Sequence, residues 1–337
     1  MSNYLIVRTH AWMQELLSPE VMRLLIDAKN LSEIVAILTP TEYGEYIVLQ
    51  ELNAENLKLA YNEVLSKRIA RILGTAIEGN IDYFKAYLRK YEIENIIRIL
   101  RFKVSETPRS EIEKYLFHFS VTKFDLEPLL TAENIDQAIV ELEHTPYAFP
   151  EDILELYQEF NTTLPLESHL KKIYYLNLLD ALKHLPAQDR SYIEGIIKSS
   201  VDIENCSIAI ASFVYGYSPE LVERLLIPYT RKISMANLRK TVYASRAEEI
   251  LGYLSPYREI VKELLHKNDI IATILSRRQI RSLYRKMYVH IASSISYVLM
   301  YLSYSEDEWR DLSYLTFALQ YNIPHEEKER YLITVSK

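Results

Sequence analysis

Apolar residues recur at spacings of three and four along the chain, and this period constrains the fold more than any other feature. Examples are the groups Leu24-Leu25-Ala28, Ile96-Ile97-Leu100 and Tyr174-Tyr175-Leu178. A period of 3.6 residues places each group on one face of a helix. Strand-like alternation framed by Asn-Gly or Asp-Gly turns is absent from the sequence. The pattern predicts an all-α chain.

Helix start signals support this prediction. Ser18-Pro19-Glu20 and Ser218-Pro219-Glu220 each place an N-cap serine before a proline and an early acid. Glycine is scarce, at 6 of 337 residues, so few positions need a positive φ. We therefore expect helices joined by short turns.

Composition narrows the class of protein. A hydrophobic content of 49% is ample for a buried core, and the length suggests about two domains. The net charge of −7 argues against a protein that binds nucleic acid through its overall charge. The single cysteine, Cys206, excludes an internal disulfide framework and a cysteine-based zinc site, and it suits a reducing compartment.

No membrane or targeting segment is predicted. The opening residues lead directly into a mixed segment without the features of a signal peptide. The longest apolar stretch, from Val289 to Tyr304, is interrupted by serines and falls short of the ~18 apolar residues of a membrane span. We interpret it as a buried helix and expect any membrane link to run through a partner.

The chain repeats itself loosely about every 105 residues. The first marker is a capping box, in which an N-cap side chain and a Glu or Gln three residues later satisfy backbone N–H groups. It occurs as Asn30 with Glu33, Asn134 with Gln137, and Ser245 with Glu248. Each box precedes a turn that contains a tyrosine, which we interpret as a turn-packing residue: Tyr43, Tyr147 and Tyr257.

A second marker follows downstream in each unit. Ile93-Glu94-Asn95-Ile96 resembles Ile203-Glu204-Asn205-Cys206 and, more weakly, Trp309-Arg310-Asp311-Leu312. We predict three related helical lobes, residues 1–113, 114–228 and 229–337. Such units are longer than the ~34 to ~47 residues of common helical solenoids. The lobes could stack in a line or close around an axis.

Motifs for chemistry are missing. The sequence has neither the G-x-x-x-x-G-K-[ST] loop that holds nucleotide phosphates nor G-x-G-x-x-G, and no H-E-x-x-H zinc pair. His266 and Asp269 could share a helix face, as many polar pairs do. Adjacent acids such as Glu248-Glu249 point about 100° apart on a helix, so we interpret them as solvated surface. No catalytic residue, metal site or cofactor is predicted.

One basic cluster stands out. Arg277, Arg281 and Arg285 lie at i, i+4 and i+8, so a helix would place them on one stripe, with Arg278 and Lys286 beside it. Guanidinium groups suit carboxylates and phosphates, so the stripe could dock on acidic groups of a partner or on lipid headgroups, or bind RNA. The alternative is a solvated face balanced by acids elsewhere in the fold.

Several motifs, in order, resemble the C subunits of rotary ATPases, the family that includes the V-type ATPase d subunit. The opening Tyr4–Leu17 segment matches its N-terminal signature at Tyr4, Arg8, Ala11, Leu16 and Leu17. Further matches are Thr41-Glu42-Tyr43-Gly44, Ile93 to Lys103, Tyr217 to Leu221, Leu225 to Pro228, and Asn322-Ile323-Pro324. Ile6, His10 and Met13 depart from the signature, and Phe102 and Tyr229 stand where glycine is common, so the chain resembles a divergent member.

The resemblance implies a specific fold and function. Three lobes with pseudo-threefold symmetry would form a funnel that joins the D and F subunits of the central stalk to the membrane proteolipid (c/K) ring. The chain would be a non-catalytic rotor subunit of an A-type ATP synthase or V-type ATPase, serving proton or sodium transport. It would be a monomer within the complex, peripheral on the cytoplasmic side, with indirect membrane contact, no cofactor and no nucleic acid.

Candidate partner contacts are Tyr4, Arg8, Arg277, Arg281 and Arg285. The resemblance places Arg8 on the first helix near the funnel interior; the alternative for Arg8 is pairing with an internal acid. A competing function is an α-helical scaffold that binds peptides or proteins and is unrelated to a rotor.

Overall fold

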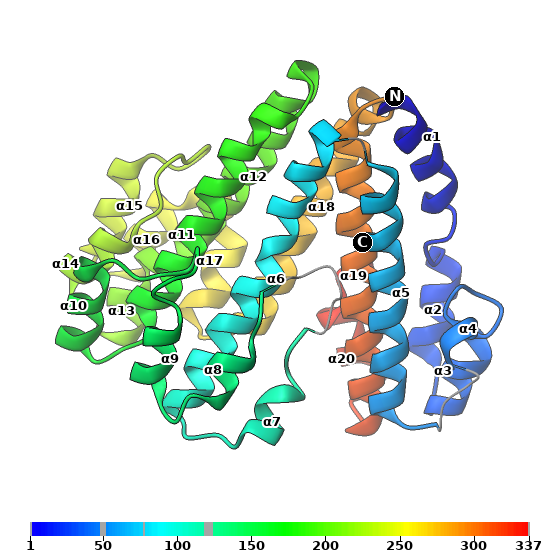
Figure 1. Ribbon diagram of the computed structural model, residues 1–337, viewed down its shortest axis with the longest axis horizontal. Helices are drawn as coiled ribbons and strands as arrows, with labels where there is room; N and C mark the ends of the chain where they lie inside the picture. The colour runs from blue at the N-terminus through cyan, green and yellow to red at the C-terminus, as the bar shows by residue number, and fades with distance from the viewer. Residues whose placement is uncertain (1, 48–51, 77, 118–123, 336–337) are drawn as a thin grey trace. The chain divides into compact units, whose positions relative to one another are not determined.

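The computed structural model describes residues 2–47, 52–76, 78–117 and 124–335 (Figure 1). Every regular element in these ranges is a helix, which confirms the all-α prediction for them. The α-helices are α1 (Ser2–Met13), α2 (Pro19–Asp27), α3 (Leu31–Leu38), α4 (Gly44–Ile47), α5 (Ala54–Thr75), α6 (Glu78–Val104), α7 (Arg109–Glu113), α8 (Glu127–Thr131), α9 (Ile135–Glu141), α10 (Glu151–Phe160), α11 (Leu164–Ala181), α12 (Ala187–Ala209), α13 (Ala211–Tyr215), α14 (Pro219–Leu225), α15 (Met235–Val242), α16 (Ala247–Tyr253), α17 (Arg258–Leu265), α18 (Asp269–Ile291), α19 (Ile295–Gln320) and α20 (His325–Lys328). Three short 3₁₀ helices are η1 (Leu182–His184), η2 (Ser255–Tyr257) and η3 (Glu329–Tyr331).

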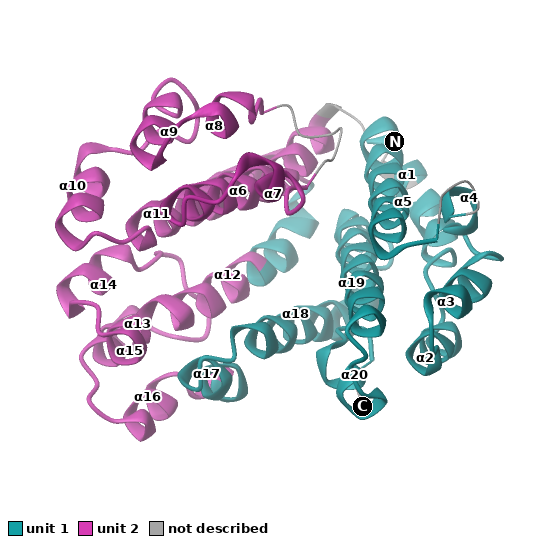
Figure 2. Cartoon of the chain, turned by 90° about the horizontal axis from the view of Figure 1, so that it is seen from below, with its two compact units in different colours: residues 1–78, 186–196, 258–337 teal, residues 79–185, 197–257 magenta. Residues whose placement is uncertain are grey.

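The chain forms two compact units, coloured separately in Figure 2. Unit 1 comprises residues 1–78, 186–196 and 258–337, so the first and last parts of the chain fold together. Unit 2 comprises residues 79–185 and 197–257. The three lobes 1–113, 114–228 and 229–337 remain a prediction from the sequence repeat.

The core of unit 1 is built around α19, which packs along α5 and α1. Leu312 and Leu315 of α19 are fully buried with Tyr61 and Val64 of α5 and with Leu25 of α2. Burying each such side chain contributes roughly 1.5–3 kcal/mol. The indole N–H of Trp309 also donates to Oδ1 of Asn62 at 2.7 Å, which fixes α19 against α5.

The predicted helix starts are largely confirmed. Ser18 and Ser218 are N-caps, each with a proline in the first turn. Asn30 and Asn134 are also N-caps. In each box the third residue of the helix accepts from the N–H just before the cap: Glu33 from Lys29 at 2.9 Å, and Gln137 from Glu133 at 2.7 Å.

The third predicted capping box, Ser245 with Glu248, is wrong. Helix α16 has Arg246 as its N-cap residue, without a side-chain cap. The Arg246 guanidinium instead pairs with Glu249, Nη2 to Oε1 at 2.6 Å. Ser245 therefore lies one residue too early to reach the N–H groups of the first turn.

The single buried helix expected from Val289 to Tyr304 is also wrong. Helix α18 ends at Ile291, and α19 begins at Ile295 with Ser294 as N-cap. Residues 295–303 are buried as expected, but Val289 is 84% exposed. The apolar stretch thus joins an exposed helix end to a buried helix start.

The second sequence marker makes the same backbone contact three times. Asn95 accepts from the N–H of Phe117 at 2.8 Å, Asn205 from that of Ile227 at 2.8 Å, and Asp311 from that of Ile333 at 2.7 Å. Each pair is separated by 22 residues. The two asparagines also donate to the carbonyl of the same partner, whereas Asp311 accepts from both the N–H and the hydroxyl of Thr334.

The turn tyrosines form a second threefold series. Each donates its hydroxyl to an acid three residues before the Asn or Asp of the marker: Tyr147 to Glu92, Tyr257 to Asp202, and Tyr43 to Glu308. The first two pairs span 55 residues, but Tyr43 and Glu308 span 265. The other two tyrosines contact an acid 55 residues away, whereas Tyr43, in the turn before α4, makes the same contact with α19 near the other end of the chain.

Candidate partner-binding surface

Helix α1 presents one exposed stripe. Tyr4, Val7 and Arg8 lie at i, i+3 and i+4, and Tyr4 is 62% and Val7 66% exposed. The Arg8 guanidinium lies 6.0 Å from the ring centroid of Tyr4 and 5.8 Å from that of Trp12. Arg8 forms no ion pair with any residue that the structure describes. Its contact with a partner stays a prediction.

The opposite face of α1 is bound to the fold. Leu5, Ile6 and Trp12 are buried. His10 Nε2 lies 2.7 Å from the carbonyl oxygen of Ala292, and its ring stacks on Tyr297 at 4.1 Å between centroids. The histidine that departs from the family signature thus joins α1 to the turn between α18 and α19.

The arginine stripe of α18 is partly neutralised within unit 1. Arg277 Nε lies 2.7 Å from Oδ1 of Asp307, and its Nη2 lies 3.3 Å from Oε2 of Glu306. Arg281 lies 3.4 Å from Oδ2 of Asp307 and 3.6 Å above the ring of Tyr304. Asp307 and Glu306 are buried, so the two arginines offset charges that the core of α19 carries.

Arg285 differs from the other two arginines. It is exposed and forms no ion pair within the described part of the chain. Beside the stripe, Arg278 donates to the backbone carbonyl of Leu332 at 2.9 Å. Acids elsewhere in the fold therefore balance Arg277 and Arg281, and Arg285 is left facing outward. That any of the three contacts a partner remains a prediction.

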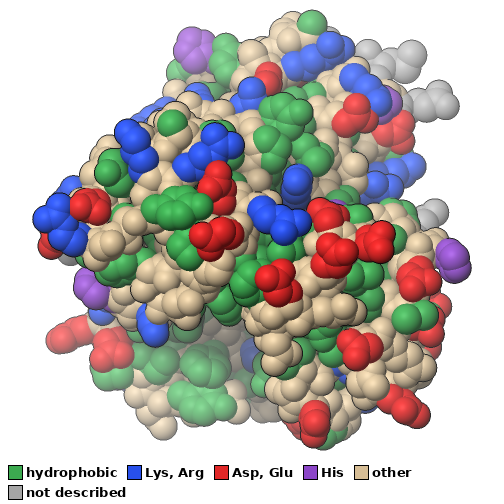
Figure 3. Space-filling model, turned by 90° about the vertical axis from the view of Figure 1, so that its left-hand side faces the viewer, with side chains coloured by type: hydrophobic (Ala, Val, Ile, Leu, Met, Phe, Trp, Pro, Cys, Tyr) green, Lys and Arg blue, Asp and Glu red, His purple; other side chains and the backbone are tan. Residues whose placement is uncertain are grey.

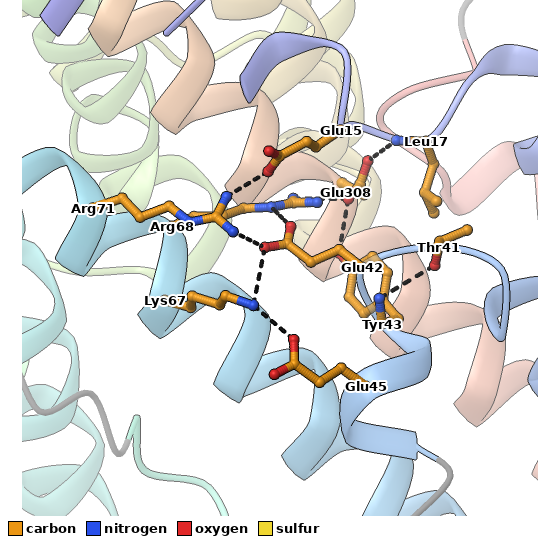
Figure 4. Close-up of polar contacts among 10 residues, drawn as sticks. All are labelled: Glu15, Leu17, Thr41, Glu42, Tyr43, Glu45, Lys67, Arg68, Arg71 and Glu308. Atoms are coloured by element: carbon orange, nitrogen blue, oxygen red, sulfur yellow. Dashed lines mark hydrogen bonds and ion pairs between the residues drawn. The ribbon is translucent and has the colours of Figure 1, made fainter. Parts of the chain in front are cut away.

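A buried charge network, absent from the sequence-based prediction, holds the N-terminal segment against α19 (Figure 4). Its centre is Arg68 on α5, whose side chain is fully buried. Arg68 Nε lies 3.0 Å from Glu42, and its Nη1 lies 2.8 Å from Oε1 of Glu308. Glu308 also accepts from the hydroxyl of Tyr43 at 2.7 Å and from the N–H of Leu17 at 2.6 Å.

The rim of this network is more exposed. Arg71 Nη2 lies 2.9 Å from Glu42, and Arg71 also pairs with Glu15. Lys67 lies 2.8 Å from Glu45 and 3.8 Å from Glu42 (Figure 4). The network therefore joins the segment after α1, the turn before α4, α4 itself, α5 and α19.

Protonation states in the network follow from burial and charge. Burial, and then the negative charge of Glu308, raise the pKa of Tyr43 well above its ordinary value, so its hydroxyl stays a donor. Burial alone would lower the pKa of Arg68, but the negative charges of Glu308 and Glu42 outweigh it and the pKa is raised. One signal could have revealed Arg68: it interrupts the buried helical series of Val64, Leu65, Ile69 and Ile72.

No metal cluster of three or more His, Cys, Asp or Glu occurs among the described residues. Unit 2 has a hollow of about 790 Å³ lined by cations and anions, among them Arg101, Lys103, Glu106 and Glu133. Its cations are used within the fold, since Arg101 pairs with Glu167 and Lys103 donates to the carbonyl of Leu130 at 3.0 Å. Charged side chains of both signs also share the face shown in Figure 3.

Residues 5–331 match the family described as ATP synthase (C/AC39) subunit. The chain belongs to this family. It is 24% identical over 344 residues to the C subunit of the A-type ATP synthase of Archaeoglobus fulgidus, an alignment that covers 98% of this chain and 95% of the relative. The like-named proteins of Pyrococcus furiosus and Thermococcus kodakarensis are 24% and 21% identical and cover 90% and 87% of this chain, with 83% and 80% of the relatives.

Membership of the C/AC39 family confirms the resemblance found in the sequence, and it makes the chain a subunit of an A/V-type ATP synthase or ATPase complex. Subunits of a complex have partners in it, so exposed side chains on α1 and α18 are candidates for contact. No helix in the described ranges has the length and apolar character that crossing a bilayer requires.

Proposed function

We propose that this chain is the non-catalytic rotor subunit that couples the D–F central stalk to the membrane proteolipid ring of an A/V-type ATP synthase or ATPase. The observation that carries the proposal is the family match over residues 5–331. In this role the chain sits peripherally on the cytoplasmic side as a monomer within the complex. It transmits rotation linked to proton or sodium transport and touches the membrane through the ring.

The repeated contacts support three related lobes for this role. The Asn95, Asn205 and Asp311 contacts recur at the spacing of the sequence repeat, and so do the three tyrosine–acid pairs. The Tyr43–Glu308 pair joins the first repeat to the last.

Binding assays with purified partners test the proposal. The full chain is offered to the cognate D–F complex and, separately, to the detergent-solubilised proteolipid ring. The coupler function requires binding to both. Binding to neither, with all partners shown to be folded, would refute the coupler function and favour the α-helical scaffold.

A further inference from the structure

We infer that one end of unit 1, made by the first turns of α1 and the last turns of α18, binds the anionic headgroup surface of a lipid bilayer. We call it the α1–α18 surface and define it by Tyr4, Val7, Arg8, Arg285, Lys286 and Val289. It stands on contacts within unit 1 and does not depend on the coupler function. It would add a direct lipid contact to the indirect one, through the ring, that the coupler function gives.

Residues of two helices far apart in the sequence meet at this end. His10 lies against the carbonyl of Ala292 at 2.7 Å and stacks on Tyr297. Tyr288 of α18 lies 6.0 Å from the same Tyr297 ring. Helix α1 and the end of α18 are therefore held against the same Tyr297 ring.

The charge of this surface is opposite to that of the chain. The chain carries −7 overall, yet α1 has no acidic residue and α18 has none after Asp269. Arg8, Arg285 and Lys286 form no ion pair with the described residues. Cations near an anionic membrane surface are attracted to it.

Each helix also carries exposed apolar side chains near its cations. Val289 is 84% exposed, one turn after Arg285, and Tyr288 is 45% exposed. On α1, Val7 and Tyr4 flank Arg8. Aliphatic side chains gain from burial at the headgroup–acyl boundary, and tyrosine and arginine favour the same interface. A protein partner would need an acid placed against each guanidinium, whereas an anionic bilayer needs only the cations and the apolar side chains that this surface supplies.

Vesicle co-sedimentation tests the inference with the full chain. The probes are phosphatidylcholine vesicles with and without phosphatidylglycerol. We expect binding only when phosphatidylglycerol is present, and weaker binding at higher salt. Reversing two cations in R285E/K286E should weaken binding at least tenfold, and Val289→Asp should also weaken it. All substituted positions are exposed, so the variants should unfold like the parent chain.

Matched variants on α2 and in the turn after it serve as controls. R23E/K29E makes the same change of charge, and Leu24→Asp replaces another exposed apolar side chain. Both should bind vesicles as the parent does. Absence of binding to anionic vesicles, or equal losses in these controls, would overturn the inference. A second result would also overturn it: the parent chain binds no vesicles, and R285E/K286E loses binding to the D–F complex or to the ring. That result would assign the surface to a protein partner and leave the coupler function intact.

Discussion

The hydroxyl of Tyr43 lies 2.7 Å from Oε1 of Glu308, across 265 residues of chain. The same carboxylate lies 2.8 Å from Nη1 of Arg68 and accepts from the N–H of Leu17 at 2.6 Å. One buried acid on α19 thus holds the turn before α4, the helix α5 and the segment between α1 and α2. Because Tyr147 and Tyr257 make the equivalent contact locally, the Tyr43 pair is the member of the series that ties the two ends of the chain.

Replacing Tyr43 by phenylalanine should destabilise unit 1. The substitution removes one hydrogen bond to a charged, buried acceptor, which costs about 1.5–3 kcal/mol. Urea unfolding should show the loss of global stability. Amide hydrogen exchange of α2 and α3 should be faster than in the parent chain. Tyr157→Phe is the control, because its hydroxyl lies 3.4 Å from an exposed aspartate, Asp136. Equal stability of Y43F and the parent chain would contradict the assigned contact.

Replacing Arg68 by methionine should be more damaging. It leaves Glu308 buried without its cation, and breaking a buried pair in this way costs about 3–5 kcal/mol. Arg71→Met is the matched control, since Arg71 also pairs with Glu42 but is partly exposed. The free energy of unfolding in urea should be highest for the parent chain, lower for R71M and much lower for R68M. The opposite order of the two variants would show that the rim, not Arg68, holds the network.

Gly44→Ala should destabilise the turn before α4. A Cβ at Gly44 would lie 2.0 Å from the carbonyl oxygen of Thr39, so the backbone of the turn would have to move. Gly74→Ala is the control: a Cβ there meets nothing within 4 Å, and alanine favours the helical conformation of α5. The thermal unfolding midpoint of G44A should be lower than that of the parent chain, and that of G74A should be equal or higher. A G44A protein as stable as G74A would contradict the close approach of the Gly44 position to the carbonyl oxygen of Thr39.

Asp311→Asn should remove one component of the pH dependence of stability. Burial raises the pKa of Asp311 to about 6 from 3.8, although hydrogen bonds from Ile333 and Thr334 lower it. The folded chain therefore holds this proton more tightly than the unfolded chain. Its contribution is fully present below pH 3.8 and is lost as the pH rises through about 6.

Urea unfolding of the parent chain and D311N from pH 4 to pH 7 measures this component. The parent-minus-variant difference in unfolding free energy should fall by about 2.5 kcal/mol over the range. Asp269→Asn, at an exposed position, controls for the amide substitution itself. A difference that is constant with pH would mean that Asp311 does not titrate in the folded chain as described.

Much of the local structure was predictable. Ser18, Ser218, Asn30 and Asn134 act as N-caps where the sequence places them, because a cap depends on residues within one turn. Ser245 failed as a cap because a shift of one residue decides which side chain reaches the first free N–H groups. The repeat markers were also visible, since the same side chain recurs wherever the same backbone contact is made.

The charged contacts were less predictable. The α18 arginines could be recognised as a stripe, but the sequence left open whether a partner or the fold itself supplies their acids. Asp307 and Glu306 lie some thirty residues further along the chain, on a helix that packs against α18. Their pairing depends on the rotation of α19 about its axis, which core packing sets.

By itself, the sequence determined that this chain is helical, where most of its helices begin, and that it repeats, because helix period and caps are local properties. Only the tertiary structure decided that Tyr43 and Arg68 meet Glu308, that Arg277 and Arg281 face inward, and that Arg8 and Arg285 face outward. Those outcomes depend on helices distant in the chain packing side by side, and no spacing within one segment encodes them.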